Sequence, residues 1–175
     1  MARVFLGLGS NIERERYLTA GLDALEILLG ELSLSSVYDS LAIGFDGQPF
    51  LNMVVGAQTD LPLPTLAARL RHIEYEHGRP VDASRFSSRQ LDIDILTYDD
   101  MVGECRSEFG VVILPRDEIL DNAFVLQPLA ELAPNDIHPV AGRSYADLWQ
   151  AYDQSAQALQ RVAFSWKGRV ISSAQ

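Results

Sequence analysis

Residues 90–98 read Gln90-Leu91-Asp92-Ile93-Asp94-Ile95-Leu96-Thr97-Tyr98, and their polar and apolar side chains alternate as in a β-strand. Successive side chains of a strand point to opposite faces of a sheet, so the carboxylates of Asp92 and Asp94 share one face. Leu91, Ile93 and Ile95 then point together into the core. This segment therefore predicts a strand that packs through one face and presents two carboxylates on the other.

The segments before this strand predict the rest of a sheet. Strands are expected at residues 3–9, 32–40 and 50–59, and helices at 13–29 and from Pro62 to Gly78. The order β-α-β-β-α-β is that of the ferredoxin-like arrangement, with helices on one face of a largely antiparallel sheet. The predicted fold class is therefore α+β, ferredoxin-like, with C-terminal additions.

Those additions are expected to be a strand at 111–114 and helices at 123–132 and 145–159. Residues 166–175 are polar, and we expect them to form a frayed tail. The length of 175 residues favours one domain, which we place at residues 1–165.

Charge and composition exclude several classes of protein. The chain has 14 Lys and Arg against 24 Asp and Glu, a formal charge of −10, so a nucleic-acid partner is not expected. No apolar run approaches the roughly 20 residues of a membrane span. The apolar start is too short for a signal peptide, and one cysteine, Cys105, cannot form an intrachain disulfide. A cytoplasmic protein is the expectation.

The Asp-x-Asp pair suggests a metal site. Two carboxylates this close repel each other, and a divalent cation removes the conflict. Magnesium prefers oxygen ligands and commonly takes one or two carboxylates, leaving its other positions to water and substrate phosphates. The alternative is an amphipathic strand with two solvated aspartates.

Upstream of this pair lies a polar loop that contains Arg79, Arg85 and Arg89 together with the aromatic Phe86. Guanidinium groups match phosphate oxygens in geometry and stay charged. A metal site beside such a loop suits phosphoryl-type transfer, and we expect residues 79–88 to close over bound phosphates. The alternative is that these arginines pair with surplus surface acids.

Two other patterns carry less information. Gly7-Leu8-Gly9-Ser10-Asn11 lacks the third glycine of a dinucleotide fingerprint and the lysine of a Walker A loop, which favours a tight turn. His72, His77 and His138 show no zinc spacing, and surface or capping roles are expected.

Five motifs occur here in the order found in one enzyme family. They are Gly9-Ser10-Asn11, Gln48-Pro49-Phe50-Leu51-Asn52, Ile73-Glu74 with Gly78-Arg79, Arg89-x-Leu91-Asp92-Ile93-Asp94-Ile95, and Phe124-Val125-Leu126-x-Pro128-Leu129-x-Glu131. From about residue 3 to about residue 139 the sequence resembles the 6-hydroxymethyl-7,8-dihydropterin pyrophosphokinases. The Arg-x-Leu-Asp-x-Asp segment is the most specific of the five.

The resemblance implies a ferredoxin-like fold and a reaction. The β,γ-pyrophosphoryl group of ATP passes to the hydroxymethyl oxygen of the pterin in folate biosynthesis, which leaves AMP and requires two magnesium ions. Pterin and ATP are the implied partners, other folate-pathway enzymes are candidate partners, and a monomer is expected.

The resemblance also implies roles for individual residues. On the pterin side, Asn52 reads the amide-like edge of the ring, Phe124 and Phe86 cover its faces, and further contacts come from Leu41, Ile43 and Phe50. Asp92 and Asp94 hold the magnesium ions, and Arg79 and Arg89 join them as catalytic residues. The ATP contacts are Glu74, Arg79, Arg85, Arg89, Ile95 and Arg116.

Four positions on the ATP side depart from the family pattern. Val81 and Asn122 stand where arginines are usual, Arg116 stands where a histidine is usual, and Asp117 stands where an aromatic or basic residue is frequent. Arg116 or Arg71 is a candidate to replace the lost charge. Two hypotheses stay open: an active pyrophosphokinase, or a weak or inactive paralogue that acts as a pterin-binding or partner protein.

Overall fold

The computed structural model describes residues 1–40, 48–79, 89–157 and 159–175. The predicted site residues Leu41, Ile43, Arg85 and Phe86, the divergent position Val81 and most of the loop at 79–88 lie outside these ranges.

The centre of the molecule is an antiparallel sheet with the strand order β5-β1-β4-β3-β8, and β2 pairs with β4. Its strands are β1 (Ala2–Ser10), β2 (Ser33–Leu34), β3 (Val37–Ser40), β4 (Phe50–Thr59), β5 (Asp92–Tyr98) and β8 (Leu159–Val162). Helices and an antiparallel sheet in one chain confirm the predicted α+β class. The segment 32–40, expected as one strand, is divided into β2 and β3.

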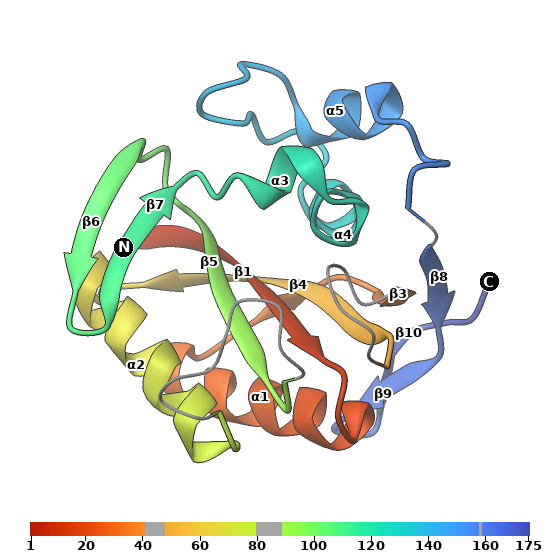
Figure 1. The fold of residues 1–175 in the computed structure, drawn as a ribbon, viewed down its shortest axis with the longest axis horizontal. Coiled ribbons are helices and arrows are strands. Elements are labelled where there is room, and N and C mark those ends of the chain that lie inside the picture. The colour runs from red at the N-terminus through yellow and green to blue at the C-terminus, as the bar shows by residue number, and fades with distance from the viewer. Residues whose placement is uncertain (41–47, 80–88, 158) are drawn as a thin grey trace.

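Helices cover both faces of this sheet (Figure 1): the two helices of the predicted β-α-β-β-α-β order share one face, and the C-terminal helices, for which no face was predicted, cover the other. One face carries α1 (Arg14–Leu29) and α2 (Leu63–Glu76), and the opposite face carries α3 (Glu118–Asp121), α4 (Ala123–Leu132) and α5 (Tyr145–Ala151). The reason lies in the strands, because β1 and β4 are apolar on both sides. Leu6 and Val55 are fully buried on the α1 face, and Phe5 and Val54 are buried on the α4 face.

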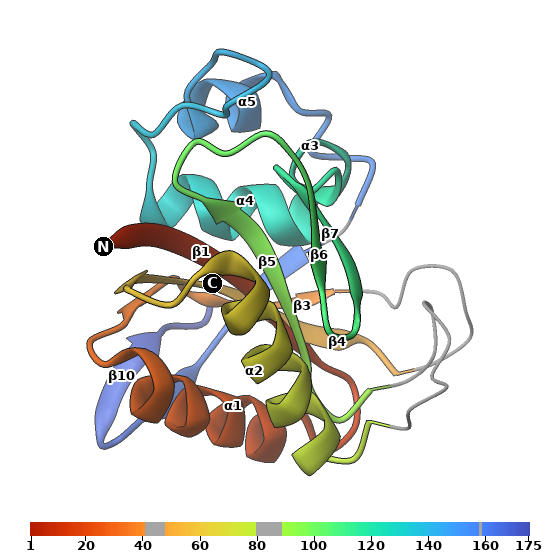
Figure 2. The ribbon, with the colours of Figure 1, turned by 90° about the vertical axis from the view of Figure 1, so that its left-hand side faces the viewer.

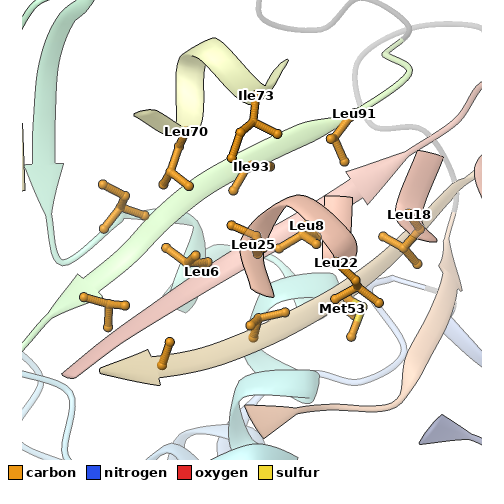
Figure 3. Close-up of a cluster of buried hydrophobic side chains, with 14 of the residues drawn as sticks. Leu6, Leu8, Leu18, Leu22, Leu25, Met53, Leu70, Ile73, Leu91 and Ile93 are labelled. Atoms are coloured by element: carbon orange, nitrogen blue, oxygen red, sulfur yellow. The ribbon is translucent and has the colours of Figure 1, made fainter. Parts of the chain in front are cut away.

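The larger core lies between the sheet and the first two helices (Figure 3). Leu18, Leu22 and Leu25 of α1 follow the helical period and are fully buried against Leu6 and Leu8 of β1. Gly30, with φ +80°, ends this helix as the sequence predicted. The second core joins α4 and α5 to the other face.

A second, two-stranded sheet lies beside α2 and β5 (Figure 2). It consists of β6 (Gly103–Ser107) and β7 (Gly110–Leu114). The prediction at 111–114 corresponds to β7, whereas β6 was missed because its residues are mostly polar and exposed.

The C-terminal predictions were partly wrong. The helix expected at 145–159 ends at Ala151, and residues 159–162 instead form β8, which extends the main sheet beside β3. The tail is not frayed, because β9 (Phe164–Trp166) and β10 (Arg169–Ser172) form a hairpin. Trp166 is only 3% exposed, and its Nε1 donates to Asp23 on α1 at 2.9 Å. Burial of this aromatic ring outweighs the polar character of the segment.

Candidate active site

The predicted site residues of β4 and β5 lie in one row across the sheet. Gly9 of β1 is paired with Asn52 of β4 on one side and with Asp92 of β5 on the other. Gly7 in the same way lies between Val54 and Asp94. Directly opposed residues share a face. Because Val54 is buried under α4, both aspartates and Asn52 lie on the face that α4 covers.

The two glycines of β1 create the space between these polar side chains. A Cβ atom at Gly9 would lie 3.0 Å from Oδ1 of Asn52 and 3.3 Å from the ring of Phe50. The sequence predicted a strand that ends at Gly9 in a tight turn, and β1 continues one residue further, to Ser10. Its glycines leave space in the site because they have no side chains. This role can be recognised only when the register of the strands is known.

The predicted pterin-binding residues that the structure describes lie around this hollow. Asn52 is 7% exposed, and its Nδ2 donates to Oγ of Ser40 at 2.7 Å, which fixes the orientation of the amide. Phe50 begins β4, and Phe124 is the second residue of α4, where it packs against the second core. An aromatic ring and an oriented amide therefore face the same side of the sheet.

Both aspartates have a pKa above the ordinary value of an aspartate. Burial, together with the charge of Asp92, raises the pKa of Asp94 to about 7. Burial and the charge of Glu74 raise the pKa of Asp92. Such a pair accepts a cation readily, because a cation removes the repulsion between the two charges.

A buried glutamate organises the arginines beside this pair. Glu74 is only 1% exposed, and its Oε1 contacts Nη1 of Arg79 at 3.1 Å and Nε of Arg71 at 3.0 Å. Its Oε2 accepts the amide of Ile93 at 2.7 Å. Burial raises the pKa of Glu74, which the two guanidinium charges oppose. The carboxylate therefore ties the end of α2 to β5 and holds the guanidinium of Arg79 beside Asp92.

Arg79 and Arg89 both reach Asp92. Nη1 of Arg89 lies 3.3 Å from Oδ1 of Asp92, and Nη1 of Arg79 lies 3.8 Å from the same oxygen. Asn11 sets the backbone of Arg89 through two bonds, since the amide of Arg89 donates to Oδ1 of Asn11 and the amide of Asn11 donates to the Arg89 carbonyl. We did not predict this role for Asn11, although it lies in the Gly-Ser-Asn motif.

A cavity of about 280 Å³ opens beside Asp94 at the outer edge of β5. Ile95 and Arg116, both predicted ATP contacts, line it together with Arg71 and Asp117. Nη2 of Arg116 lies 3.6 Å from Oδ1 of Asp94 and 2.8 Å from Oε1 of Glu118. Arg116 and Arg71, the two candidates for replacing lost charge, thus both face this cavity.

Asn122, at the divergent position before α4, has a structural role. It donates to Glu118 and accepts from Gln157, whose Oε1 in turn accepts the first amide of α4, that of Ala123, at 2.8 Å. Asn122 and Gln157 therefore hold the start of the helix that carries Phe124.

The donor set suits magnesium. Within the described ranges no three His, Cys, Asp or Glu side chains come close enough to hold a metal ion by themselves. Two hard carboxylates with further positions left open match magnesium that is bound together with substrate phosphates.

Comparison with known proteins adds independent findings. Residues 5–134 match the family model described as 7,8-dihydro-6-hydroxymethylpterin-pyrophosphokinase (HPPK). The chain is 37% identical over 142 residues to the 2-amino-4-hydroxy-6-hydroxymethyldihydropteridine pyrophosphokinase of Aquifex aeolicus, covering 80% of this chain and 86% of that protein. It is 37% identical over 153 residues to the enzyme of the same name from Pseudomonas aeruginosa, covering 85% and 91%.

Among solved structures, the wild-type HPPK-DHPS of Plasmodium falciparum superposes with a TM-score of 0.75 at 14% identity. That match covers 98% of this chain and 50% of the other, so this chain corresponds in length to half of the larger protein. At such identity the likeness concerns the fold.

The family model and the named relatives agree on one class of protein, the ATP-dependent diphosphotransferases. The chain belongs to the 7,8-dihydro-6-hydroxymethylpterin-pyrophosphokinase family. It transfers pyrophosphate from ATP to 6-hydroxymethyl-7,8-dihydropterin in folate synthesis, which confirms the function predicted from its motifs.

Proposed function

We propose that Asp92 and Asp94 bind two magnesium ions together with the triphosphate of ATP. Magnesium held by these two carboxylates would neutralise the charge that develops on the phosphates during transfer. The pairing of both aspartates with glycines of β1 supports this assignment, because the residue that lies beside each aspartate in the neighbouring strand has no side chain. This juxtaposition is the observation on which the proposal rests.

The arginines complete the phosphate side of the site. Arg79 and Arg89 already contact Asp92, and in the complex their guanidinium groups donate to phosphate oxygens, since planar guanidinium matches these oxygens. Arg116 and Ile95 line the adjacent cavity, which we assign to the nucleoside part of ATP. Arg85, in the loop outside the described residues, is proposed to join them.

The pterin is proposed to lie on the α4 face of the sheet. Asn52 bonds to the ring edge and Phe124 stacks on one ring face, with Phe50 at the start of β4 beside them. A planar heterocycle needs stacking surfaces and few, well-oriented polar partners. Leu41, Ile43 and Phe86, outside the described residues, are proposed to complete the pocket.

The order β5-β1-β4-β3 supports assigning the core to the ferredoxin-like arrangement, with β8 as an added edge strand. Some relatives join this activity to a second one, as in the folate synthesis bifunctional protein of Chlamydia caviae. We therefore propose folate-pathway enzymes as partners, and a cytoplasmic monomer as the form that meets them. In the described residues no helix is both long and apolar enough to cross a membrane.

The arrangement favours turnover over a role in binding alone. A protein that only binds pterin has no use for a paired-carboxylate site ringed by arginines, whereas Asp92, Asp94, Arg79 and Arg89 all lie together here. The test is AMP release from ATP with magnesium and the hydroxymethyl dihydropterin.

Asp92→Asn and Asp94→Asn should each abolish AMP release while the protein stays folded. Asp100→Asn changes an exposed aspartate on the turn after β5 and should have no effect. Near-native AMP release by either site variant would overturn the metal assignment. Absent release by the unchanged protein, with intact pterin binding, would favour the binding-protein alternative.

A further inference from the structure

Glu131 lies on α4 on the same side of that helix as Phe124. The two residues are seven positions apart, which is close to two helical turns and places them on one stripe about 10 Å apart along the axis. Helix α4 packs against β4 and β3, and Figure 1 shows it above the sheet.

The carboxylate of Glu131 contacts the start of β3. Its Oε2 accepts from Oγ of Ser36 at 2.6 Å, and both oxygens accept the amide of Ser36 at 3.1 and 3.3 Å. Its Oε1 also accepts the hydroxyl of Tyr38 at 3.0 Å. Three donors thus converge on one carboxylate.

These donors are buried where the sheet is interrupted. Ser36 lies between β2 and β3, and within the described residues its amide bonds to Glu131 alone. Ser36 and Tyr38 are 8% and 4% exposed, although Glu131 itself is exposed. Without the carboxylate these groups would be buried without partners, which costs stability.

This contact joins the two sides of the pterin pocket. Tyr38 is paired directly with Asn52 in the register of β3 and β4, and both point to the α4 face. Glu131 therefore connects the strand neighbour of Asn52 to the helix that carries Phe124. Pro128 has no amide hydrogen to donate to the carbonyl of Phe124, so the helix lacks one of its own hydrogen bonds at that residue. The contact through Glu131 therefore has a larger part in fixing the position of Phe124.

We propose that Glu131 is a positioning residue for the pterin site: through Ser36 and Tyr38 it sets the height and rotation of α4, and so the gap between Phe124 and Asn52. The inference rests on the proposed pterin roles of Asn52 and Phe124. Glu131 does not touch the substrate in this account.

Glu131→Gln is the sharpest variant. Glutamine keeps the length of the side chain but turns one acceptor into a donor, which then faces Ser36 or Tyr38. At a temperature where the variant is fully folded, we expect its Kd for 6-hydroxymethyl pterin to rise roughly tenfold, the effect of weakening one hydrogen bond or stacking contact. The Kd of the variant for an ATP analogue with magnesium should stay within about twofold of the value for the unchanged protein. The reason is that no residue of α4 lines the cavity beside Asp94, which we assign to ATP.

Two further variants sharpen the test. Glu31→Gln makes the same change at an exposed glutamate after α1 and should alter neither affinity. Tyr38→Phe removes one of the donors to Glu131. The loss of pterin affinity that it causes should be smaller in the Glu131→Gln variant than in the unchanged protein. Additive effects of the two changes on pterin affinity would contradict the connection through Tyr38.

A measurement on the ligand-free protein distinguishes a failure of this inference from a failure of the proposed function. With 4-fluorophenylalanine at Phe124, the ¹⁹F resonance should shift in Glu131→Gln and stay in place in Glu31→Gln. An unchanged resonance together with an unchanged pterin Kd would show that Glu131 only stabilises the fold, and would overturn the inference. Failure of the unchanged protein to bind pterin would instead count against the pterin assignment, while the resonance would still test the position of α4.

Discussion

A side chain at Gly9 would collide with Asn52: a Cβ atom built there lies 3.0 Å from Oδ1 of the amide. Gly9→Ala should therefore displace Asn52 and weaken pterin binding by roughly tenfold, the effect of losing about one hydrogen bond. The measurement is calorimetric titration with the hydroxymethyl pterin. Gly56→Ala is the matched control, because a Cβ there would lie 3.0 Å from Phe5, and this change should lower stability without changing pterin affinity.

Asn52→Ala should weaken pterin binding by about 1–3 kcal/mol, the cost of leaving a buried polar group unpaired. Ser40→Ala removes only the acceptor that orients the amide and should have a smaller effect in the same direction. Calorimetry on both variants gives the order of the two effects. Unchanged affinity in Asn52→Ala would refute the assignment of the ring edge.

Asp94→Asn should stabilise the metal-free protein at high pH. Burial raises the folded pKa of Asp94 to about 7 from 3.8, so ionisation costs folding free energy as the pH rises from 4 to 7. Urea unfolding in EDTA should show a gain of about 2–4 kcal/mol at pH 8 and almost none at pH 4. Asp100→Asn should show no such difference, and an equal gain at both pH values would mean that the cost of ionising Asp94 is not the cause.

His138 should make the fold sensitive to acid. Its Nδ1 accepts the amides of Val140 and Ala141 at 3.1 and 2.9 Å, and burial lowers its pKa below the ordinary 6.5. Since the folded state resists protonation, stability is lost as the pH falls below about 6.5. Urea midpoints measured between pH 7 and pH 5 should fall less in His138→Asn than in the unchanged protein. His72→Asn, at an exposed histidine, should keep the full pH dependence.

Much of the fold could be predicted from periodicity. Strand β4 and helix α4 were predicted with the bounds that the structure has, because each has a continuous apolar pattern with a clear stop. The C-terminal strands could not be predicted, since their burial depends on partners far away in the sequence. Trp166, for example, is buried against α1, which precedes it by more than a hundred residues.

The site was predicted as a set of residue types but not as an arrangement. Asp92, Asp94 and Arg89 stood out because their spacing carries chemistry. The roles of Gly9, Asn11 and Glu131 depend on which strands are neighbours, and no local pattern contains that information.

The pairing of β3 with β8 has a consequence for synthesis. Val37 of β3 is paired with Val162 of β8. Strand β3 is therefore synthesised 125 residues before the strand that pairs with its outer edge. Until then the outer edge of β3 offers free amides and carbonyls to any other extended chain. Until β8 has been synthesised, the nascent protein therefore exposes an unpaired strand edge that favours aggregation. Chaperones that bind extended strand edges would act in that interval.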